Sequence, residues 1–287
     1  MLNVAIIGLG VIGGTFAKAF KASDSSNYNV MGIDTNPEAI TKAIEAGVIT
    51  EGEVENQTIL QRADIVIIAL YPDNVATFIE EHADEFKEDA IVTETTGVKQ
   101  SIIDKIIPVL PAQIEFIFGH PMAGRESRGF DYSDHTAFIG ANYVLTPLET
   151  NSKESLDSFQ ALLRRIGFNR ITQVSPKVHD ELIAYTSQLC HVIATALINS
   201  DQDEHNTSQF IGDSFRDLTR IAKLNENLWS ELMLSNKEAL LTIIEQFESK
   251  IDQLKQAIVN DDKESLESQF IEATERRVKL EENDLKI

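Results

Sequence analysis

A short apolar segment followed at once by three spaced glycines constrains the fold of this chain most strongly. Residues 4–7, Val-Ala-Ile-Ile, are typical of a strand buried on both faces of a sheet. Gly8, Gly10 and Gly13 follow in the pattern GxGxxG. The first glycine permits a tight turn, the second lets the backbone approach a pyrophosphate, and the third lets the next helix pack on the sheet. The segment therefore predicts a strand, a phosphate-binding loop and a helix that directs its first amides at the phosphates.

A second apolar segment, residues 30–33, ends at an acidic residue, Asp34. An acid at this distance from the glycines accepts hydrogen bonds from the adenosine ribose, and its charge repels the 2′-phosphate of NADP. Since Thr35 and Asn36 follow and no arginine adjoins the acid, we expect NAD as the cofactor. The expected cofactor-binding residues are Gly8, Gly10, Val11, Ile12, Gly13 and Asp34.

Strand-like and helix-like segments continue to alternate up to residue 174. The expected strands are 63–69, 91–94, 115–118, 142–146 and 170–174, and the expected helices are 11–22, 37–46, 73–86, 101–109 and 153–166. This alternation predicts a Rossmann-type doubly wound, mostly parallel sheet, which binds ligands at the carboxyl ends of its strands. Thr95 and Thr96 follow one of these strands and either contact a ligand or serve as turn hydroxyls. Lys99, in the same loop, is equally consistent with an ordinary surface lysine.

His120 follows another of these strands, in the segment Gly-His-Pro-Met-Ala-Gly at residues 119–124. Pro121 restricts the backbone of His120 to an extended conformation, which holds the imidazole at a fixed place. Its position at the end of a strand makes it a candidate general acid or base. The alternative is a capping or core histidine without a chemical role.

The second half of the chain is predicted to be helical. Ser175 and Pro176 form a helix start, and a helix is expected over 175–199, apolar on most faces and therefore central. It carries His179 and His191, which a regular helix separates by about 120°, so the two need not meet. Long helices are expected over 225–260 and 263–280, with Trp229 in the core. So much apolar surface on helices suggests a dimer.

Two arginines, Arg216 and Arg220, stand four positions apart in the segment Phe-Arg-Asp-Leu-Thr-Arg-Ile-Ala at residues 215–222. One interpretation is a surface ladder of ion pairs with Asp217. The other is a guanidinium turned inward to bind a substrate carboxylate. The residues alone leave both open.

Composition excludes several functional classes. The chain has 25 basic and 46 acidic residues and a formal net charge of −21, which argues against nucleic-acid and anionic-membrane partners. Its one cysteine, Cys190, excludes an intrachain disulfide and fits a reducing compartment. The most apolar window, residues 65–70, is too short to span a bilayer. We expect a cytoplasmic protein with a small-molecule substrate and no metal site.

Several blocks in the same order resemble the prephenate dehydrogenase family, including its arogenate-using relatives in tyrosine biosynthesis. The blocks are Gly8–Gly13 with Asp34, residues 119–124 with Glu126 and Gly129, His179-Asp180, residues 187–191, and residues 215–222. The resemblance implies an NAD-binding domain over 1–174 and an all-helical substrate and dimerisation domain over 175–287. It implies oxidative decarboxylation of prephenate to 4-hydroxyphenylpyruvate, CO2 and NADH by a homodimer.

The same resemblance implies roles for individual residues. His120 would accept the hydroxyl proton, Arg220 would bind the side-chain carboxylate, His191 would line the pocket, and Glu126 would lie at its rim. His179 would serve either the helix or the dimer interface. Gly97 replaces a serine found in many members, which leaves Thr95 and Thr96 as the hydroxyls for the substrate.

Three alternatives remain open at this stage. An arogenate dehydrogenase would pair the acid of Glu126 with the substrate ammonium. A 3-hydroxyacid or imine reductase would typically carry a lysine on the helical domain, and the 179–191 segment contains none. A non-catalytic NAD-binding module would keep Asp34 and the glycines but would have no use for His120 or Arg220.

Overall fold

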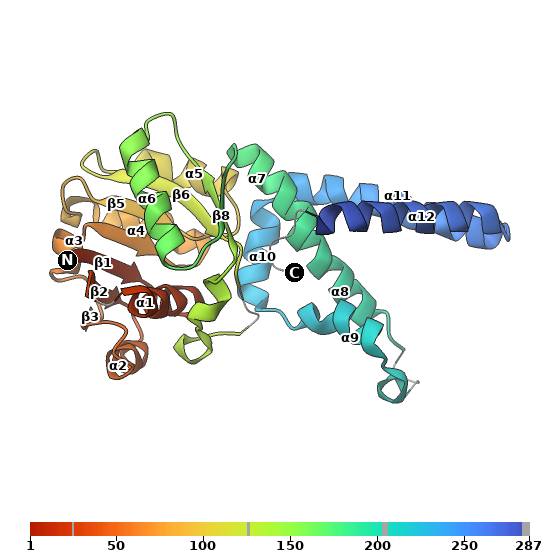
Figure 1. The fold of residues 1–287 in the computed structure, drawn as a ribbon, viewed down its shortest axis with the longest axis horizontal. Coiled ribbons are helices and arrows are strands. Elements are labelled where there is room, and N and C mark those ends of the chain that lie inside the picture. Colours follow the sequence, from red (N-terminus) through yellow and green to blue (C-terminus); the bar gives the residue numbers. More distant parts are fainter. Residues whose placement is uncertain (25, 125–126, 203–205, 283–287) are drawn as a thin grey trace.

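The computed structural model describes residues 1–24, 26–124, 127–202 and 206–282. An N-terminal region is built around one sheet, and helices form a C-terminal region beside it (Figure 1).

The sheet has the strand order β3-β2-β1-β4-β5-β6-β7-β8. Its strands are β1 (Leu2–Ile7), β2 (Tyr28–Ile33), β3 (Glu51–Glu53), β4 (Ile65–Ile68), β5 (Ile91–Glu94), β6 (Glu115–Pro121), β7 (Asn142–Thr146) and β8 (Arg170–Gln173). All neighbours pair in parallel except β6 and β7, which are antiparallel. The predicted doubly wound, mostly parallel sheet is confirmed. The short edge strand β3 was not predicted, because its sequence Glu-Gly-Glu has no apolar pattern.

Helices cover both faces of the sheet, which is why its central strands are mostly apolar. They are α1 (Val11–Asp24), α2 (Pro37–Glu45), α3 (Ile59–Arg62), α4 (Pro72–Glu81), α5 (Gln100–Ile106) and α6 (Lys153–Arg165). The core on one face includes residues of α1, α2 and α6, and the core on the other includes residues of α3, α4 and α5. The side chain of Asn36 accepts a hydrogen bond from Glu38 N–H and caps α2, with Pro37 in the first turn.

The C-terminal helices are α7 (Pro176–Ile183), α8 (Leu189–Asn199), α9 (Asp213–Thr219), α10 (Glu226–Ser235), α11 (Lys237–Val259) and α12 (Lys263–Glu281). A π-helical segment, Ala184–Gln188, joins α7 to α8. The single helix expected over 225–260 is wrong, because the chain breaks at Asn236 between α10 and α11. Asn236 is buried and donates to Asp180 O and Gln188 Oε1, so its side chain joins the break to the central helix. Helices α11 and α12 project from the body as a hairpin (Figure 1).

Within the described residues, one helical stretch, Pro176–Asn199, has the length and hydropathy of a membrane span. The same length and composition occur in central helices of soluble proteins, so the finding is weak support for a span. In the single chain 33% of the apolar window is buried. The remainder is apolar surface that another chain could cover.

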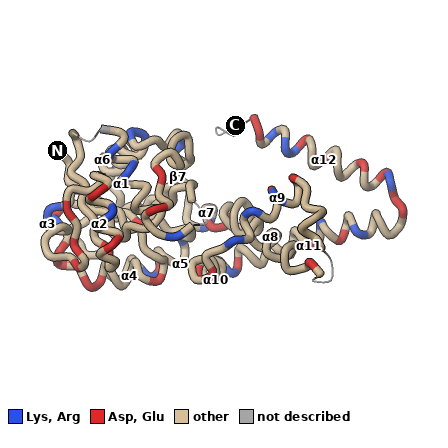
Figure 2. Tube along the Cα trace, turned by 90° about the horizontal axis from the view of Figure 1, so that it is seen from below, with Lys and Arg blue, Asp and Glu red and all other residues tan. Residues whose placement is uncertain are grey.

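Basic and acidic positions are interspersed over both regions (Figure 2). Opposite charges frequently pair, as in Arg62 with Glu51 and Lys105 with Asp73. The surface therefore carries charges of both signs with an excess of acidic ones, and a net charge far from zero favours solubility.

Candidate active site

The glycine loop lies between β1 and α1, with Asp34 beside it. Gly8 has φ +87°, and a Cβ there would lie 2.7 Å from Ala69 O. A Cβ at Gly13 would lie 1.8 Å from Gly8 O, so only glycine allows α1 to begin this close to the strand. A Cβ at Gly10 meets no atom within 4 Å, which leaves open space where a phosphate could approach.

Asp34, at the end of β2, is joined to this loop by a hydrogen bond. Leu9 N–H donates to Asp34 Oδ2 (2.6 Å), and Asn36 N–H donates to Oδ1 (2.8 Å). Because a carboxylate can accept about four hydrogen bonds, lone pairs remain for ribose hydroxyls. The predicted residues Gly8, Gly10, Val11, Ile12, Gly13 and Asp34 thus form one cradle that fits a dinucleotide.

His120 lies near the end of β6, at the same edge of the sheet as the glycine loop. Its Nδ1 lies 3.0 Å from Nε2 of His179, on α7 of the helical region. His179 Nδ1 lies 2.7 Å from Asp180 Oδ1. The two carboxylate oxygens of Asp180 also accept the N–H groups of Lys99 and Gln100, both at 2.8 Å. A single chain of polar contacts thus runs from His120 to the start of α5.

This chain of contacts determines which nitrogen of His120 carries the proton. Asp180 accepts, so His179 Nδ1 donates and its Nε2 is an acceptor in the neutral ring. His120 Nδ1 must then donate to His179, which leaves His120 Nε2 without a proton. Burial lowers the pKa of His120 well below the ordinary value of 6.5, and the charges of His179 and Lys99 add to this effect. His120 is therefore a neutral imidazole, and its Nε2 is an acceptor that has no hydrogen bond within the part of the chain that the structure describes.

The loop after β5 faces that nitrogen. A Cβ added at Gly97 would lie 3.7 Å from His120 Nε2 and 3.4 Å from Leu232 Cδ2 of α10. Thr96 is buried, and its hydroxyl lies 2.5 Å from Glu94 Oε2. Thr95 is half-buried, and its hydroxyl makes a long contact of 3.4 Å with Ile68 O. Thr95 is therefore the more available hydroxyl of the two.

The helical region contributes His191, Trp229 and a short 3₁₀ turn, Arg220–Ala222. His191 Nδ1 lies 3.0 Å from Ile221 O, and its ring centroid lies 3.7 Å from that of Trp229. These contacts hold the turn that begins at Arg220 against α8. Arg216 instead contacts Asp213 Oδ1 (2.7 Å) and Ile211 O (3.0 Å), so its guanidinium belongs to a surface pair.

Comparison with known proteins places both regions in one family. Residues 16–172 match the family model "Prephenate dehydrogenase, nucleotide-binding domain", and residues 175–272 match "Prephenate dehydrogenase, dimerization domain". This chain belongs to the prephenate dehydrogenase family. The resemblance, the expected fold and the expected NAD-dependent oxidoreductase class are confirmed.

Individual members of the prephenate dehydrogenase family agree with this assignment. The prephenate dehydrogenase of Bacillus subtilis is 29% identical over 281 residues, which are 96% of this chain and 75% of the relative. The structure of prephenate dehydrogenase from Aquifex aeolicus in complex with hydroxyphenyl propionate and NAD+ has a TM-score of 0.88 and 31% identity, covering 98% of both chains. Synechocystis arogenate dehydrogenase has a TM-score of 0.82 and 25% identity, covering 97% of this chain and 100% of the other.

Glu126, expected at the rim of the family's substrate pocket, lies outside the described residues. His120, Thr95 and Thr96 are brought to one edge of the sheet, and His191 lies against the turn that starts with Arg220. The motifs did not show that His179 contacts His120. They assigned Trp229 to the core, but its side chain is only half-buried and its ring lies against His191. That Asp180 directly follows His179 in the sequence was the one signal that His179 and Asp180 act together.

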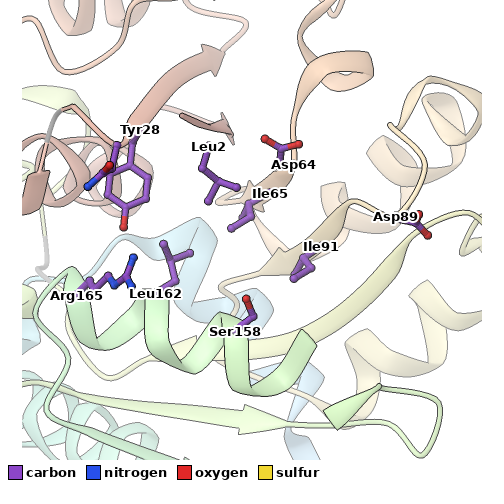
Figure 3. Close-up of a pocket in the computed structure, with 10 residues that line it drawn as sticks. Leu2, Tyr28, Asp64, Ile65, Asp89, Ile91, Ser158, Leu162 and Arg165 are labelled. Carbon is purple, nitrogen blue, oxygen red and sulfur yellow. The ribbon is translucent and has the colours of Figure 1, made fainter. Parts of the chain in front are cut away.

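A cavity of about 410 Å³ lies elsewhere in the molecule. Figure 3 shows it between α6 and the strands, lined by Leu2, Ile65, Ile91, Leu162 and Arg165 among others. Leu2, Ile65 and Ile91 are the first residues of parallel strands, so this cavity is at the amino ends of the sheet. The candidate site lies at the opposite, carboxyl edge, and the cavity is separate from it.

Proposed function

We propose that this chain catalyses the NAD-dependent oxidative decarboxylation of prephenate to 4-hydroxyphenylpyruvate and CO2. The observation that carries the proposal is the contact of His120 Nδ1 with His179, which is in turn held by Asp180. It leaves His120 Nε2 as a base at the edge of the sheet that carries the glycine loop. The reaction class comes from the family to which the chain belongs.

The cofactor is assigned to the cradle of Gly8, Gly10, Val11, Ile12, Gly13 and Asp34. The open space at Gly10 and the N-terminus of α1 suit a pyrophosphate. Asp34 suits the ribose hydroxyls and disfavours a 2′-phosphate. When bound there, NAD supplies the acceptor for the hydride of the substrate carbinol carbon.

In this proposal His120 accepts the substrate proton and later donates it. Its Nε2 accepts the hydroxyl proton while the carbinol carbon becomes a carbonyl. Loss of CO2 then returns the bonding electron pair to the ring, which becomes an aromatic phenolate. The proton held on His120 matches the one that the phenolate oxygen requires, so the step balances. The imidazolium formed in between is stabilised through His179 by the carboxylate of Asp180.

Binding of the substrate is assigned to both regions of the chain. Arg220 is proposed to bind the side-chain carboxylate through its planar guanidinium. His191 would line the pocket, and the ring of Trp229 against it would keep its orientation fixed. Thr95 is proposed to contact the substrate directly, and Thr96 to hold the loop through its contact with Glu94. Glu126 remains proposed at the rim.

Arogenate is the second candidate substrate. The similarity to Synechocystis arogenate dehydrogenase over 97% of this chain favours it. Arogenate carries an ammonium where prephenate carries a keto oxygen, so its use would call for a carboxylate partner, for which Glu126 is the candidate.

The test is NADH formation by the purified protein with NAD and either prephenate or arogenate. We expect faster turnover with prephenate. His120→Asn should lower kcat by about 10³-fold without changing the dissociation constant of NAD, since the base is lost and the cradle is intact. His135→Asn is the matched control and should retain full activity, because His135 is a half-buried histidine in the 3₁₀ helix His135–Phe138 with no assigned role in the site. Absence of NADH with both substrates would contradict the proposed reaction, and full turnover of His120→Asn would exclude that residue as the base.

A further inference from the structure

An ion pair without any solvent exposure lies beneath the candidate site. Lys99 Nζ lies 2.7 Å from Glu94 Oε1, and both side chains are 0% exposed. Lys99 Nζ also donates to Thr96 O (2.8 Å) and lies 3.4 Å from Val98 O. All these neighbours are acceptors, which suits an ammonium group with three donors. Burial lowers the pKa of Lys99, and the charge of Glu94 opposes that shift.

Each partner of the pair also holds a segment of the site. Glu94 Oε2 accepts Thr96 N–H (2.7 Å), and Glu94 Oε1 accepts Gly119 N–H (3.3 Å), one residue before His120. The backbone N–H of Lys99 donates to Asp180 Oδ1, the oxygen that also contacts His179. Two charges buried without water are costly, and such a pair is weak support for stability alone. Since stability alone does not account for the buried pair, we look for its role in the site that it contacts.

We propose that Lys99 and Glu94 are positioning residues, which join the 95–98 loop, the peptide before His120 and the Asp180 carboxylate into one unit that presents His120 to the substrate as a base. This inference deepens the proposed function and rests on it. The pair does not touch the reacting atoms, so its effect passes through His120 and its neighbours.

The charges around His120 support this role. The charged groups are Glu94 and Lys99 on β5 and its loop and Asp180 on α7. The other neighbours are the imidazole of His179, the buried phenol of Tyr143 on β7 and the apolar Leu232 of α10. The charge of Lys99 lowers the pKa of His120. His120 must be neutral to accept a proton, so activity is present above its pKa and is lost as pH falls through it. Removing Lys99 should therefore move the acid limb of kcat/KM to higher pH.

The decisive variants are Lys99→Met and the double variant Lys99→Met/Glu94→Gln, which removes both buried charges. We expect each to bind NAD as the unmodified protein does. In Lys99→Met the midpoint of the acid limb of kcat/KM should move to higher pH by roughly one unit. In the double variant the move should be smaller, because the opposing charge of Glu94 is lost as well. In both variants kcat should fall by roughly tenfold, with KM changed less than kcat. Lys87→Met, which removes a lysine paired with Asp64 at the far edge of the sheet, is the matched control. It should leave the pH profile unchanged.

Titration of the His120 imidazole by 15N NMR in the intact protein provides a second readout that needs no substrate. It separates this inference from the proposed function, because a raised pKa of His120 in Lys99→Met would stand even if neither substrate were turned over. An unchanged pH profile together with an unchanged His120 titration would show that the Lys99–Glu94 pair serves packing only, and would overturn the proposal. If both Lys99 variants fail to fold, Glu94→Gln decides: the unpaired cation should move the His120 titration to lower pH, and an unmoved titration would overturn the proposal.

Discussion

The two regions of the chain bury their apolar side chains to very different degrees. In the N-terminal region, two core clusters lie on opposite faces of the sheet, and many of their members have no exposed surface. In the helical region, α12 has no buried residue among those described, and Phe210, Leu234 and Phe270 are 85%, 72% and 59% exposed. The first region supplies its own core, whereas the second leaves apolar surface that a partner must cover. Its match to a dimerization domain explains that difference.

The candidate site lies where these unequal regions meet. Several polar contacts cross the boundary: His120 with His179, Lys99 and Gln100 with Asp180, Tyr71 with Asn225, and Arg128 with Glu226. Polar contacts are directional, so the geometry of the base depends on the position of α7 and α10. The well-packed region carries the glycine loop and Asp34, and the less packed region supplies His179 and Asp180 to the candidate site.

In this comparison, the largest effect is expected from replacing the carboxylate of Asp180, which joins the two regions. Asp180→Asn offers one oxygen where two backbone N–H groups and His179 now require acceptors. An amide N–H facing His179 would reverse its tautomer, and His120 Nε2 would then carry the proton. We expect kcat to fall by about 10²-fold, with NAD binding retained because the cradle is remote. The measurements are steady-state kinetics and NAD titration.

Asp252→Asn, an exposed position on α11, is the control for loss of one carboxylate in the helical region. Full activity of Asp180→Asn would show that the boundary contacts are structural only. The helical region would then contribute less to catalysis than proposed.

A smaller effect is expected from charging the apolar surface of α12. Phe270 and Ile271 are each 59% exposed in the single chain. Phe270→Asp should raise the dissociation constant of the dimer by at least roughly tenfold, because a partly desolvated charge replaces an aromatic contact. Ser268→Asp, exposed on the same helix, adds the same charge without removing apolar surface. Sedimentation velocity over a range of concentrations measures both, and equal dissociation constants would show that the dimer uses another face.

The geometry of the glycine loop could be predicted because its determinants are local. The turn at Gly8, the close approach at Gly13 and the acid at the end of the next strand all follow from fixed spacings. Capping of α2 by Asn36 was predictable for the same reason. Such features depend on neighbours within one or two elements of the chain.

The helical side of the site was less predictable, because its geometry depends on irregular backbone and on distant contacts. Regular helix places His179 and His191 about 120° apart, but the π-helical segment Ala184–Gln188 adds a residue to one turn and reduces this to about 20°. The pattern also allowed Lys99 to be a surface lysine, since only the folded chain buries it together with Glu94, five residues earlier. Asn236 interrupts an amphipathic pattern, because its side-chain amide donates hydrogen bonds to acceptors on α7 and on the π-helical segment.

The smallest expected effect tests the gap between the two regions at Gly97. A Cβ there meets Leu232 at 3.4 Å and His120 Nε2 at 3.7 Å, which are ordinary contact distances, and Gly97 has no positive φ. Gly97→Ser should therefore fold and place a hydroxyl beside the base. We expect a change in kcat/KM of about threefold or less, because one hydroxyl adds a hydrogen bond of modest net free energy. Gly97→Ala separates the effect of volume from that of the hydroxyl. A large loss of activity in both variants would mean that the space between the loop and α10 is needed for the substrate itself.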